Sequence, residues 1–517
     1  MSETPPDASD TLAADSEEGR SRGSVVLIAA RLAALAIQVI TLPIVVRAVG
    51  DTGFGAASTA QVIATFAMLL DFGFGEGGWT SLLRAGTDPS GREIVRMRRT
   101  HMLLWLSVGM SGLVVVTLLG LVIPLSDYKG ASFPIFAAAG FYFLWWSMHM
   151  ATGHFFMALK RFSQLALVNS CSTILGQIIS LAMTFTTRRP EWILLGPAVG
   201  CIVSTSIGMV VARQIRRKLE ITPRFDRELA KSFFRIGVKS YFNRCLTYIM
   251  GGADRIIVGL VSQTQLGIYE KTTRVTNGLH DATTQIRNTL YADITRSHMT
   301  DPQKFARDLD RLSRMSLMIA FTFIVIPSAF GTSILHILFK EGAYSGGTIL
   351  MLCRATYCAF EQYYAIFAIG ILAMIKPHLH LRVTIWNAGV TVLATYPMFQ
   401  AFGVLGVGYM NVGLNVLLLI PYLIMVKRRV STEFPIRAHF RAVLTLFAVA
   451  GVMVAVCILV SAWLVNMHLA WLSIAVAPLL MGVGLLAFLA TGQVAAPSPL
   501  MRVLNRRMPA FARRVMP

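Results

Sequence analysis

Charged residues are scarce in this chain of 517 residues. Aspartate, glutamate, lysine and arginine together make up 14% of it, whereas hydrophobic residues make up 55% and the mean hydropathy is +0.61. An average soluble domain carries about 25% charged residues. The composition therefore excludes an ordinary soluble protein and indicates an integral membrane protein.

Several functional motifs are also missing. The sequence contains no GxxxxGK[ST] phosphate loop, which argues against ATP hydrolysis. It has no sizeable segment between its apolar runs that could form a nucleotide-sugar site, and no loop that interrupts a helix pair as a selectivity filter does. These absences argue against an ATPase, a nucleotide-sugar enzyme and a channel.

Cysteine is rare, and the positions of the cysteines argue against redox or metal chemistry. All six fall within apolar runs, where a thiol behaves as a small apolar side chain. They are Cys171, Cys201, Cys245, Cys353, Cys358 and Cys457. His149 and His154 lack a third metal-type ligand nearby. We therefore expect no metal site and no resident cofactor.

Long apolar runs are what the sequence has in abundance. A helix of about 20 apolar residues crosses the hydrocarbon of a bilayer, and all of its backbone hydrogen bonds are internal. Fourteen such spans are predicted, and the most polar of them is 267–292. They are 24–47, 54–83, 101–125, 132–158, 164–187, 192–212, 236–262, 267–292, 315–337, 346–375, 381–400, 404–426, 442–466 and 469–490. The expected fold class is an all-α polytopic membrane protein with about 14 transmembrane helices.

The basic residues indicate the topology of these spans. The formal net charge is +21, but arginine and lysine gather in every second connection, as in the loop 213–235 and the tail 491–517. This alternation follows the positive-inside rule, so both termini are expected in the cytoplasm and no nucleic-acid partner is expected. An acidic partner for the basic tail is the less favoured alternative. Residues 1–23 are acidic and poor in aromatics, which predicts a disordered cytoplasmic tail and no signal peptide.

A weak internal repeat is visible. The string DTGFG at 51–55 corresponds to QTQLG at 263–267 with an offset of 212 residues, and LLGPAVG at 194–200 corresponds to VLGVGYM at 404–410 with an offset of 210. Membrane transporters are often built from duplicated halves. The shared offset predicts two six-helix halves, 24–212 and 236–426, joined by the loop 213–235 and followed by two further helices within 442–490.

Charged residues inside the spans form stripes at helical spacing. In span 267–292 one face carries Glu270, Arg274, Asn277, Asp281, Thr284 and Asn288. In span 236–262, Arg244 and Arg255 are eleven residues apart, so they are almost aligned and separated by about 16 Å along the axis. A charge exposed to lipid costs several kcal/mol, which predicts a water-filled cavity lined by these residues.

Other spans contribute further candidates for this cavity. They are Arg31 and Gln38 in the first span, Asp71 and Glu76 in the second, His149, Gly153 and His154 in the fourth, and Arg354, Tyr357 and Glu361 in the tenth. The alternative is that the charges only neutralise one another. Glu270 could pair with Arg274 at i,i+4 spacing, or with Arg255 across the short turn between two spans.

Three stretches of the sequence resemble a known family. They are LPIVVRAVGDTGFGAASTAQVIATFAMLLDFGFGEG at 42–77, ADRIIVGLVSQTQLGIYEKTTRV at 253–275 and FGVLGVGYMNVGLN at 402–415. They are similar to bacterial polysaccharide exporters, the O-antigen and exopolysaccharide flippases of the multidrug/oligosaccharidyl-lipid/polysaccharide exporter superfamily. The resemblance covers about residues 24 to 490. It implies two six-helix bundles packed as a V, plus a final helix pair, in the bacterial inner membrane.

The resemblance also implies a function. The expected activity is flipping of a polyprenyl-diphosphate-linked oligosaccharide across the membrane by alternating access, driven by an ion gradient of H⁺ or Na⁺, with membrane lipids around the protein. Polysaccharide polymerase and chain-length machinery are the further partners expected. Arginine binds phosphate oxygens through bidentate hydrogen bonds at any physiological pH, so Arg31, Arg244, Arg255 and Arg274 are the candidate substrate-binding residues. Asp71, Asp254, Asp281 and Glu361 are the candidate ion-coupling residues.

Two other functions stay open at this stage. A drug or cation antiporter of the same superfamily would favour an acidic cavity over an arginine-rich one. A membrane polysaccharide polymerase or glycosyltransferase would handle similar lipids but would show a large loop on the outer side, whereas the odd-numbered connections here are short. The sequence favours a transporter over an enzyme.

Overall fold

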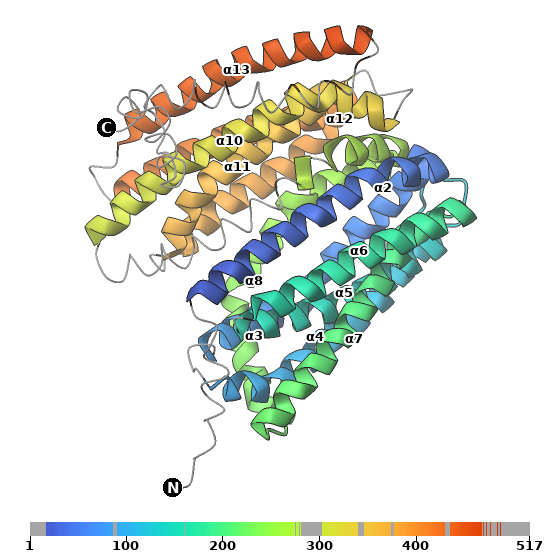
Figure 1. The fold of residues 1–517 in the computed structure, drawn as a ribbon, viewed down its shortest axis with the longest axis vertical. Helices are drawn as coiled ribbons and strands as arrows, with labels where there is room; N and C mark the ends of the chain where they lie inside the picture. Colours follow the sequence, from blue (N-terminus) through green and yellow to red (C-terminus); the bar gives the residue numbers. More distant parts are fainter. Residues whose placement is uncertain are drawn as a thin grey trace. The chain divides into compact units, whose positions relative to one another are not determined.

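Helices are the regular elements of the part of the chain that the structure describes (Figure 1). This structure is a computed structural model that describes residues 17–85, 90–159, 161–274, 276–278, 280, 302–339, 346–373, 377–429, 435–467, 469, 472, 476, 483 and 486. Among these residues, six helices are long and apolar enough to cross a membrane. The protein is therefore a multi-pass membrane protein, while the number of fourteen spans stays a prediction.

The chain divides by its contacts into two compact units, residues 1–270 and residues 271–517. The two halves expected from the repeat, 24–212 and 236–426, are defined by sequence similarity, and they stay a prediction. The helices of the first unit are α2 (Glu17–Phe66), the 3-10 helix η1 (Ala67–Asp71), α3 (Phe74–Ala85), α4 (Arg92–Val122), α5 (Ser132–Ala158), α6 (Phe162–Thr187), α7 (Trp192–Leu219) and α8 (Arg227–Val261). The second unit contains α10 (Pro302–Phe339), α11 (Gly347–Ala373), α12 (Pro377–Arg429) and α13 (Ile436–Asn466).

Two long helices are kinked where the sequence predicts a connection between spans. Gly50 lies inside α2 with φ 74°, and Gly403 lies inside α12 with φ 60°. Glycine adopts a positive φ without the steric cost that a Cβ would bring. The kinks separate the first predicted span from the second, and the eleventh from the twelfth. The helix α2 begins at Glu17, seven residues before the predicted first span.

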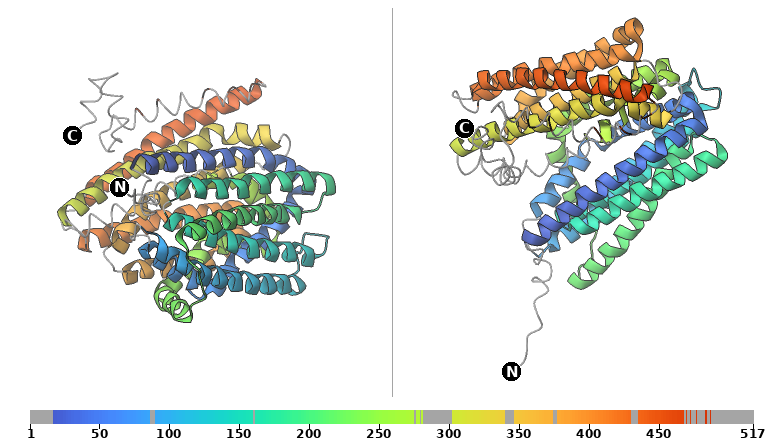
Figure 2. Two further views of the ribbon diagram at one scale, coloured as in Figure 1. Left: turned by 60° about the horizontal axis from the view of Figure 1, so that its bottom comes forward. Right: turned by 45° about the horizontal axis from the view of Figure 1, so that its top comes forward.

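Within each unit the helices pack lengthwise on one another (Figure 2). In the first unit α4 packs on α5, α6 on α7 and α2 on α6, around a buried core that includes Trp105, Phe136 and Phe143. In the second unit α10 packs on α11 and α13, around a core that includes Phe321 and Phe367. Small residues let transmembrane helices approach closely, and Ala56, Ala57, Ala60 and Ala64 of α2 lie in the first core for this reason.

Helix α8 follows the second predicted span along its length, and this contact positions the candidate site. A Cβ on Gly55 would lie 1.7 Å from the carbonyl oxygen of Gln263, and a Cβ on Gly237 would lie 1.7 Å from that of Gly73. Between these two contacts, a Cβ on Gly259 would lie 2.4 Å from Oγ1 of Thr59. Backbone atoms of the two segments are thus in contact at both ends, because no side chain intervenes.

Candidate functional site

The second predicted span, 54–83, is broken in its middle. The helix α2 ends at Phe66, the 3-10 turn η1 follows, and α3 begins only at Phe74. Phe72 and Gly73 between them have φ 44° and 93°. Positive φ is uncommon for a bulky residue such as phenylalanine. The break therefore corrects the expectation of one continuous helix, and discontinuous helices are where transporters commonly build their binding sites.

The carboxylate of Asp71 satisfies the backbone at this break. Its side chain has no exposed surface, and it accepts hydrogen bonds from the backbone N–H groups of Gly73 at 2.9 Å and Gly75 at 3.2 Å. Gly73 directly precedes α3 and Gly75 lies in its first turn, where the helix dipole also favours a negative charge. The carboxylate of Asp71 is thus positioned by hydrogen bonds from its own segment.

Arg244 of α8 forms an ion pair with Asp71. Its Nη1 atom lies 2.5 Å from Oδ2 of Asp71, and its guanidinium lies 5.8 Å from the centre of the Tyr248 ring. The side chain of Arg244 keeps 20% of its surface exposed, whereas that of Asp71 is fully buried. The hydroxyl of Tyr241, one turn earlier on α8, donates to the carbonyl oxygen of Leu69 at 2.7 Å. Tyr241 and Arg244 of α8 therefore bond to polar groups that the break in the helix leaves without helical partners.

Aromatic and histidine side chains adjoin the ion pair. The rings of Trp79 and His154 stack with 4.7 Å between their centroids, and Nδ1 of His154 lies 3.4 Å from Nε2 of His101. Gly75 leaves room for this cluster, because a Cβ there would lie 2.6 Å from Oδ2 of Asp71 and 2.8 Å from the ring of Trp105. The site around Arg244 is thus lined by one ion pair and by flat rings from α3, α4 and α5.

Further along α8 the structure pairs a second arginine with an acid. Nε of Arg255 lies 3.1 Å from Oε1 of Glu270, although the N–H does not point along a hydrogen bond. This is the pair across the short turn that the sequence left as one of two alternatives. Asp254, which is 4% exposed, accepts from the hydroxyl of Tyr269 at 3.2 Å. Arg244 and Arg255 are therefore held by different acids at different heights of α8.

The second unit holds a further polar group. Nε2 of His280 lies 3.4 Å from Oε2 of Glu361, and its Nδ1 lies 3.2 Å from the amide nitrogen of Gln362. Nε of Arg354 donates to Oδ1 of Asn277 at 2.7 Å. The expected residues Arg354, Asn277 and Glu361 are thus bonded to neighbours from other helices. Sequence reasoning missed His280, although a titratable residue inside an apolar span is itself a signal.

The remaining expected site residues are only partly described. Arg31 lies in α2, and Arg274 lies in the helical segment after residue 262, where its side chain is half-buried. Asp281 lies outside the described residues. The roles of all eight residues, in substrate binding or in ion coupling, stay predictions.

At the C-terminal end of α8, Asp127 from the connection after α4 caps the helical segment that begins at Gln263. Asp127 accepts hydrogen bonds from the hydroxyl of Ser262 at 2.6 Å and from the backbone N–H of Thr264 at 3.2 Å. Its own N–H donates to Oε1 of the buried Gln263 at 2.7 Å. The hydrogen bond from Ser262 is the main reason why the pKa of Asp127 lies below its usual range.

Comparisons with known proteins identify the fold. A family model described as polysaccharide biosynthesis protein matches residues 21–280. No curated protein sequence matches the chain.

The lipid II flippase MurJ in an inward closed conformation aligns with a TM-score of 0.64 and 13% identity, over 89% of this chain and 98% of that chain. A multidrug resistance MATE family transporter aligns in its inward-facing conformation with a TM-score of 0.56 and 13% identity, over 78% of this chain and 98% of that one. In its outward-facing conformation such a transporter aligns with a TM-score of 0.54 and 14% identity, over 82% and 98%. The protein therefore has the polytopic membrane fold that these flippases and transporters share.

Proposed function

Since the chain belongs to the polysaccharide biosynthesis protein family, we propose that it flips polyprenyl-diphosphate-linked oligosaccharides across the bacterial inner membrane by alternating access. The cargo would be a unit for O-antigen or exopolysaccharide synthesis, and the termini would lie in the cytoplasm. The flipped unit would then pass to a polysaccharide polymerase and its chain-length machinery on the outer side. The family match, the basic even-numbered connections and the similarity to the MurJ fold support this proposal.

The observation that carries the proposal is the Arg244–Asp71 pair at the helix break. An arginine within a transmembrane span is costly unless it is paired or hydrated, and Arg244 keeps 20% of its side-chain surface exposed while it is paired with Asp71, so an anionic ligand has access to its guanidinium. Guanidinium presents five N–H donors in a planar fork that matches the oxygens of a phosphate. The diphosphate of a lipid-linked sugar is such a ligand.

The surroundings of Asp71 allow Arg244 to change partners. The carboxylate also accepts from Gly73 and Gly75, so it keeps two hydrogen bonds when the guanidinium turns to the cargo. Without these bonds the loss of Arg244 would leave an uncompensated buried charge, which costs about 3–5 kcal/mol. We therefore propose that Asp71 and the cargo phosphate are alternative partners of Arg244. Arg31, Arg255 and Arg274 are the further arginines proposed to bind the cargo.

Ion coupling belongs to the same proposal. Energy coupling needs a group whose charge differs between the two access states, and a carboxylate in a span fulfils this by taking up H⁺ or Na⁺. Asp71, Asp254, Asp281 and Glu361 are the proposed residues. Among them Glu361 contacts His280, whose Nε2 lies 3.4 Å from its Oε2, so a second ionisable side chain adjoins this carboxylate.

A drug or cation antiporter is the second candidate, because the chain shares its fold with multidrug resistance MATE family transporters. A cationic drug would be repelled by Arg244, whereas a diphosphate would be attracted. A polymerase is the third candidate, and it would lengthen the same lipid instead of moving it.

Reconstituted proteoliposomes distinguish the three candidates. A fluorescent polyprenyl-diphosphate oligosaccharide is placed in both leaflets, and a membrane-impermeant reagent that destroys only the outer label measures flipping. We expect flipping that is lost in Arg244→Ala and retained in the matched control Arg428→Ala, at the exposed end of α12. Retention of full flipping by Arg244→Ala, transport of an organic cation alone, or elongation of the sugar would each overturn the proposal.

A further inference from the structure

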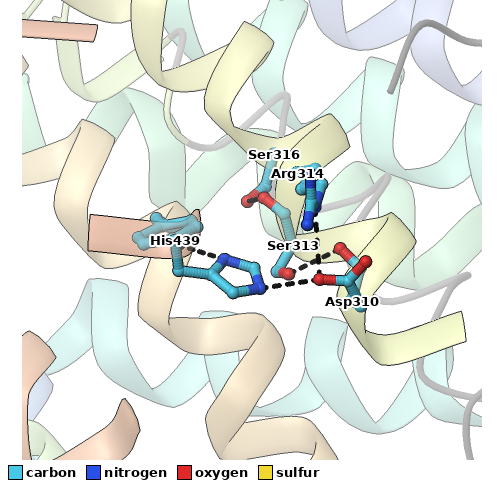
Figure 3. A network of polar contacts seen from close by, with 6 residues as sticks. Asp310, Ser313, Arg314, Ser316 and His439 are labelled. Carbon is cyan, nitrogen blue, oxygen red and sulfur yellow. Dashed lines mark hydrogen bonds and ion pairs between the residues drawn. The ribbon is translucent and has the colours of Figure 1, made fainter. Parts of the chain in front are cut away.

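A second buried polar network joins three helices of the second unit, away from the residues of the proposed site. Nε2 of His439 on α13 lies 2.8 Å from Oδ1 of Asp310 on α10, and its Nδ1 lies 2.7 Å from the hydroxyl of Tyr363 on α11. Nε of Arg314, one turn after Asp310, donates to the same carboxylate oxygen at 3.2 Å. Figure 3 shows His439 and Arg314 converging on Asp310 from two helices.

Water reaches this network from one end. The side chain of Asp310 keeps 28% of its surface exposed, that of His439 keeps none, and Tyr363 is 1% exposed. Asp310 lies near the start of α10, before the predicted span 315–337, on the side where the topology places the cytoplasm. A proton can therefore reach the network at the carboxylate of Asp310, which is hydrogen-bonded to the imidazole of His439.

The hydrogen bonds are complete when the imidazole is neutral. An ionised carboxylate only accepts, so Nε2 of His439 carries the hydrogen and donates it to Asp310. Nδ1 then accepts from the hydroxyl of Tyr363. The charges of Asp310 and Arg314 cancel, and the group carries no net charge.

An added proton weakens the network wherever it binds. On Nδ1 of His439 it reverses the hydrogen bond to Tyr363 and leaves a net positive charge with little access to water. On Asp310 it removes the charge that holds Arg314 and His439. Burial raises the pKa of Asp310. The hydrogen bond from His439 and the charge of Arg314 outweigh burial, so the pKa lies below its usual range. The deprotonated carboxylate is thus the form that the structure stabilises.

Helix α13 depends on this network at one end and on a different contact at the other. The hydroxyls of Ser333 on α10 and Ser461 on α13 lie 2.7 Å apart, and both residues are buried. The two residues are 128 positions apart, and Asp310 and His439 are 129 apart, so α10 and α13 run parallel in constant register. Serine hydroxyls do not titrate, so of these two contacts the one at His439 is the one that responds to pH.

We propose that Asp310, His439 and Tyr363 form a proton-binding site, and that proton uptake there loosens the first turns of α13 from α10 and α11. The Ser333–Ser461 contact holds the other end, so α13 hinges about it. Among the described residues, Arg314 and Tyr363 are charged or titratable groups that contact His439 or its carboxylate. The site does not depend on the identity of the cargo, and its test needs no transport.

Hydrogen–deuterium exchange of the full-length protein in lipid nanodiscs tests the site. Exchange is followed between about pH 4 and pH 8, with times corrected for the intrinsic rate. We expect exchange in peptides covering 436–445 to rise roughly tenfold on acidification, as for a contact linked to one proton. Peptides around Ser461 should stay protected at every pH.

Four variants separate a proton site from a purely structural contact. His439→Phe and Asp310→Asn should each remove the pH dependence. Asp310→Asn keeps the shape of the side chain, so it provides the test if His439→Phe does not fold. Tyr363→Phe removes the hydroxyl bond that opposes protonation of Nδ1, so it should move the transition to higher pH. The control Ser461→Ala should leave the pH dependence unchanged. Protection of 436–445 that does not change with pH in the wild type, or a pH dependence that persists in His439→Phe and Asp310→Asn, would overturn the proposal.

Discussion

The hydroxyl oxygens of Thr52 and Thr264 lie 2.8 Å apart, although the two residues are 212 positions apart in the chain. This separation equals the offset of the repeat that the strings DTGFG and QTQLG indicate. Two equivalent residues meet in this way when a pseudo-twofold axis passes between them. The contact is what the predicted repeat would produce.

A disulfide should form across this contact. In the double variant Thr52→Cys with Thr264→Cys, mild oxidation should join the two thiols, because the side-chain oxygens that the sulfur atoms replace lie 2.8 Å apart. Mass labelling of the denatured protein should then detect two more thiols after reduction than before. Each single variant serves as a control, and equal labelling before and after reduction of the double variant would contradict the contact.

Alanine should be harmful at one glycine of α8 and harmless at another. In Gly237→Ala the new Cβ would lie 1.7 Å from the carbonyl oxygen of Gly73, a backbone atom that cannot move aside. We expect a loss of about 1–3 kcal/mol in the free energy of unfolding, or more. In the matched control Gly251→Ala the Cβ meets nothing within 4 Å, so the higher helix propensity of alanine should stabilise the protein by about 0.5–1 kcal/mol. Denaturation in detergent measures both, and equal effects would show that α8 is not packed as described.

A double-mutant cycle should reveal strong coupling between Asp71 and Arg244. Asp71→Asn leaves the guanidinium without its counter-charge, and we expect it to lower the free energy of unfolding by about 3 kcal/mol. Adding Arg244→Gln should restore part of that loss, since no unpaired charge then remains. Additive effects of the two changes would mean that the ion pair contributes little. In the flipping assay Arg244→Lys should recover only part of the activity, because lysine lacks the bidentate fork.

Acid should weaken the cap formed by Asp127. The pKa of this carboxyl is lowered in the folded protein, chiefly by the hydroxyl of Ser262, so its contribution to stability is present above the unfolded pKa of about 3.9 and is lost as the pH falls through the lower folded pKa. We expect the melting temperature of the wild type to fall more steeply below about pH 4 than that of Asp127→Asn. Ser262→Ala removes the donor and should reproduce the shallower profile. Identical profiles for all three proteins would exclude this linkage.

Energy coupling through Glu361 should be separable from cargo binding. Glu361→Gln keeps the size of the side chain but cannot exchange a proton, so transport should lose most of its response to an imposed H⁺ or Na⁺ gradient. Binding of the lipid-linked oligosaccharide should stay within a few-fold of the wild type. If the variant responds to both gradients as the wild type does, Glu361 only neutralises His280 and its surroundings.

The sequence alone determined the class of the protein and the outline of its helices. Hydrophobic content is local, so each long apolar run could be assigned on its own, and the kinks at Gly50 and Gly403 fall at predicted connections. The repeat offset could likewise be found by comparing short strings. The break after Asp71 was not predicted, although Asp71, Glu76 and the glycines of the segment 73–78 interrupt the apolar run 54–83. The polar groups that the break frees are satisfied by residues of α8, far away in the sequence.

Only the tertiary structure decided which charges meet. By spacing, Glu270 could pair with Arg274 or with Arg255, and the packing of α8 against the following helical segment brings it to Arg255. Asp71 and Arg244 are 173 positions apart, and Asp310 and His439 are 129 apart. Such pairs depend on the register of two packed helices, which glycine contacts and side-chain volumes set over the whole interface. A stripe of charges therefore predicts that partners exist, whereas their identity follows from how the helices pack.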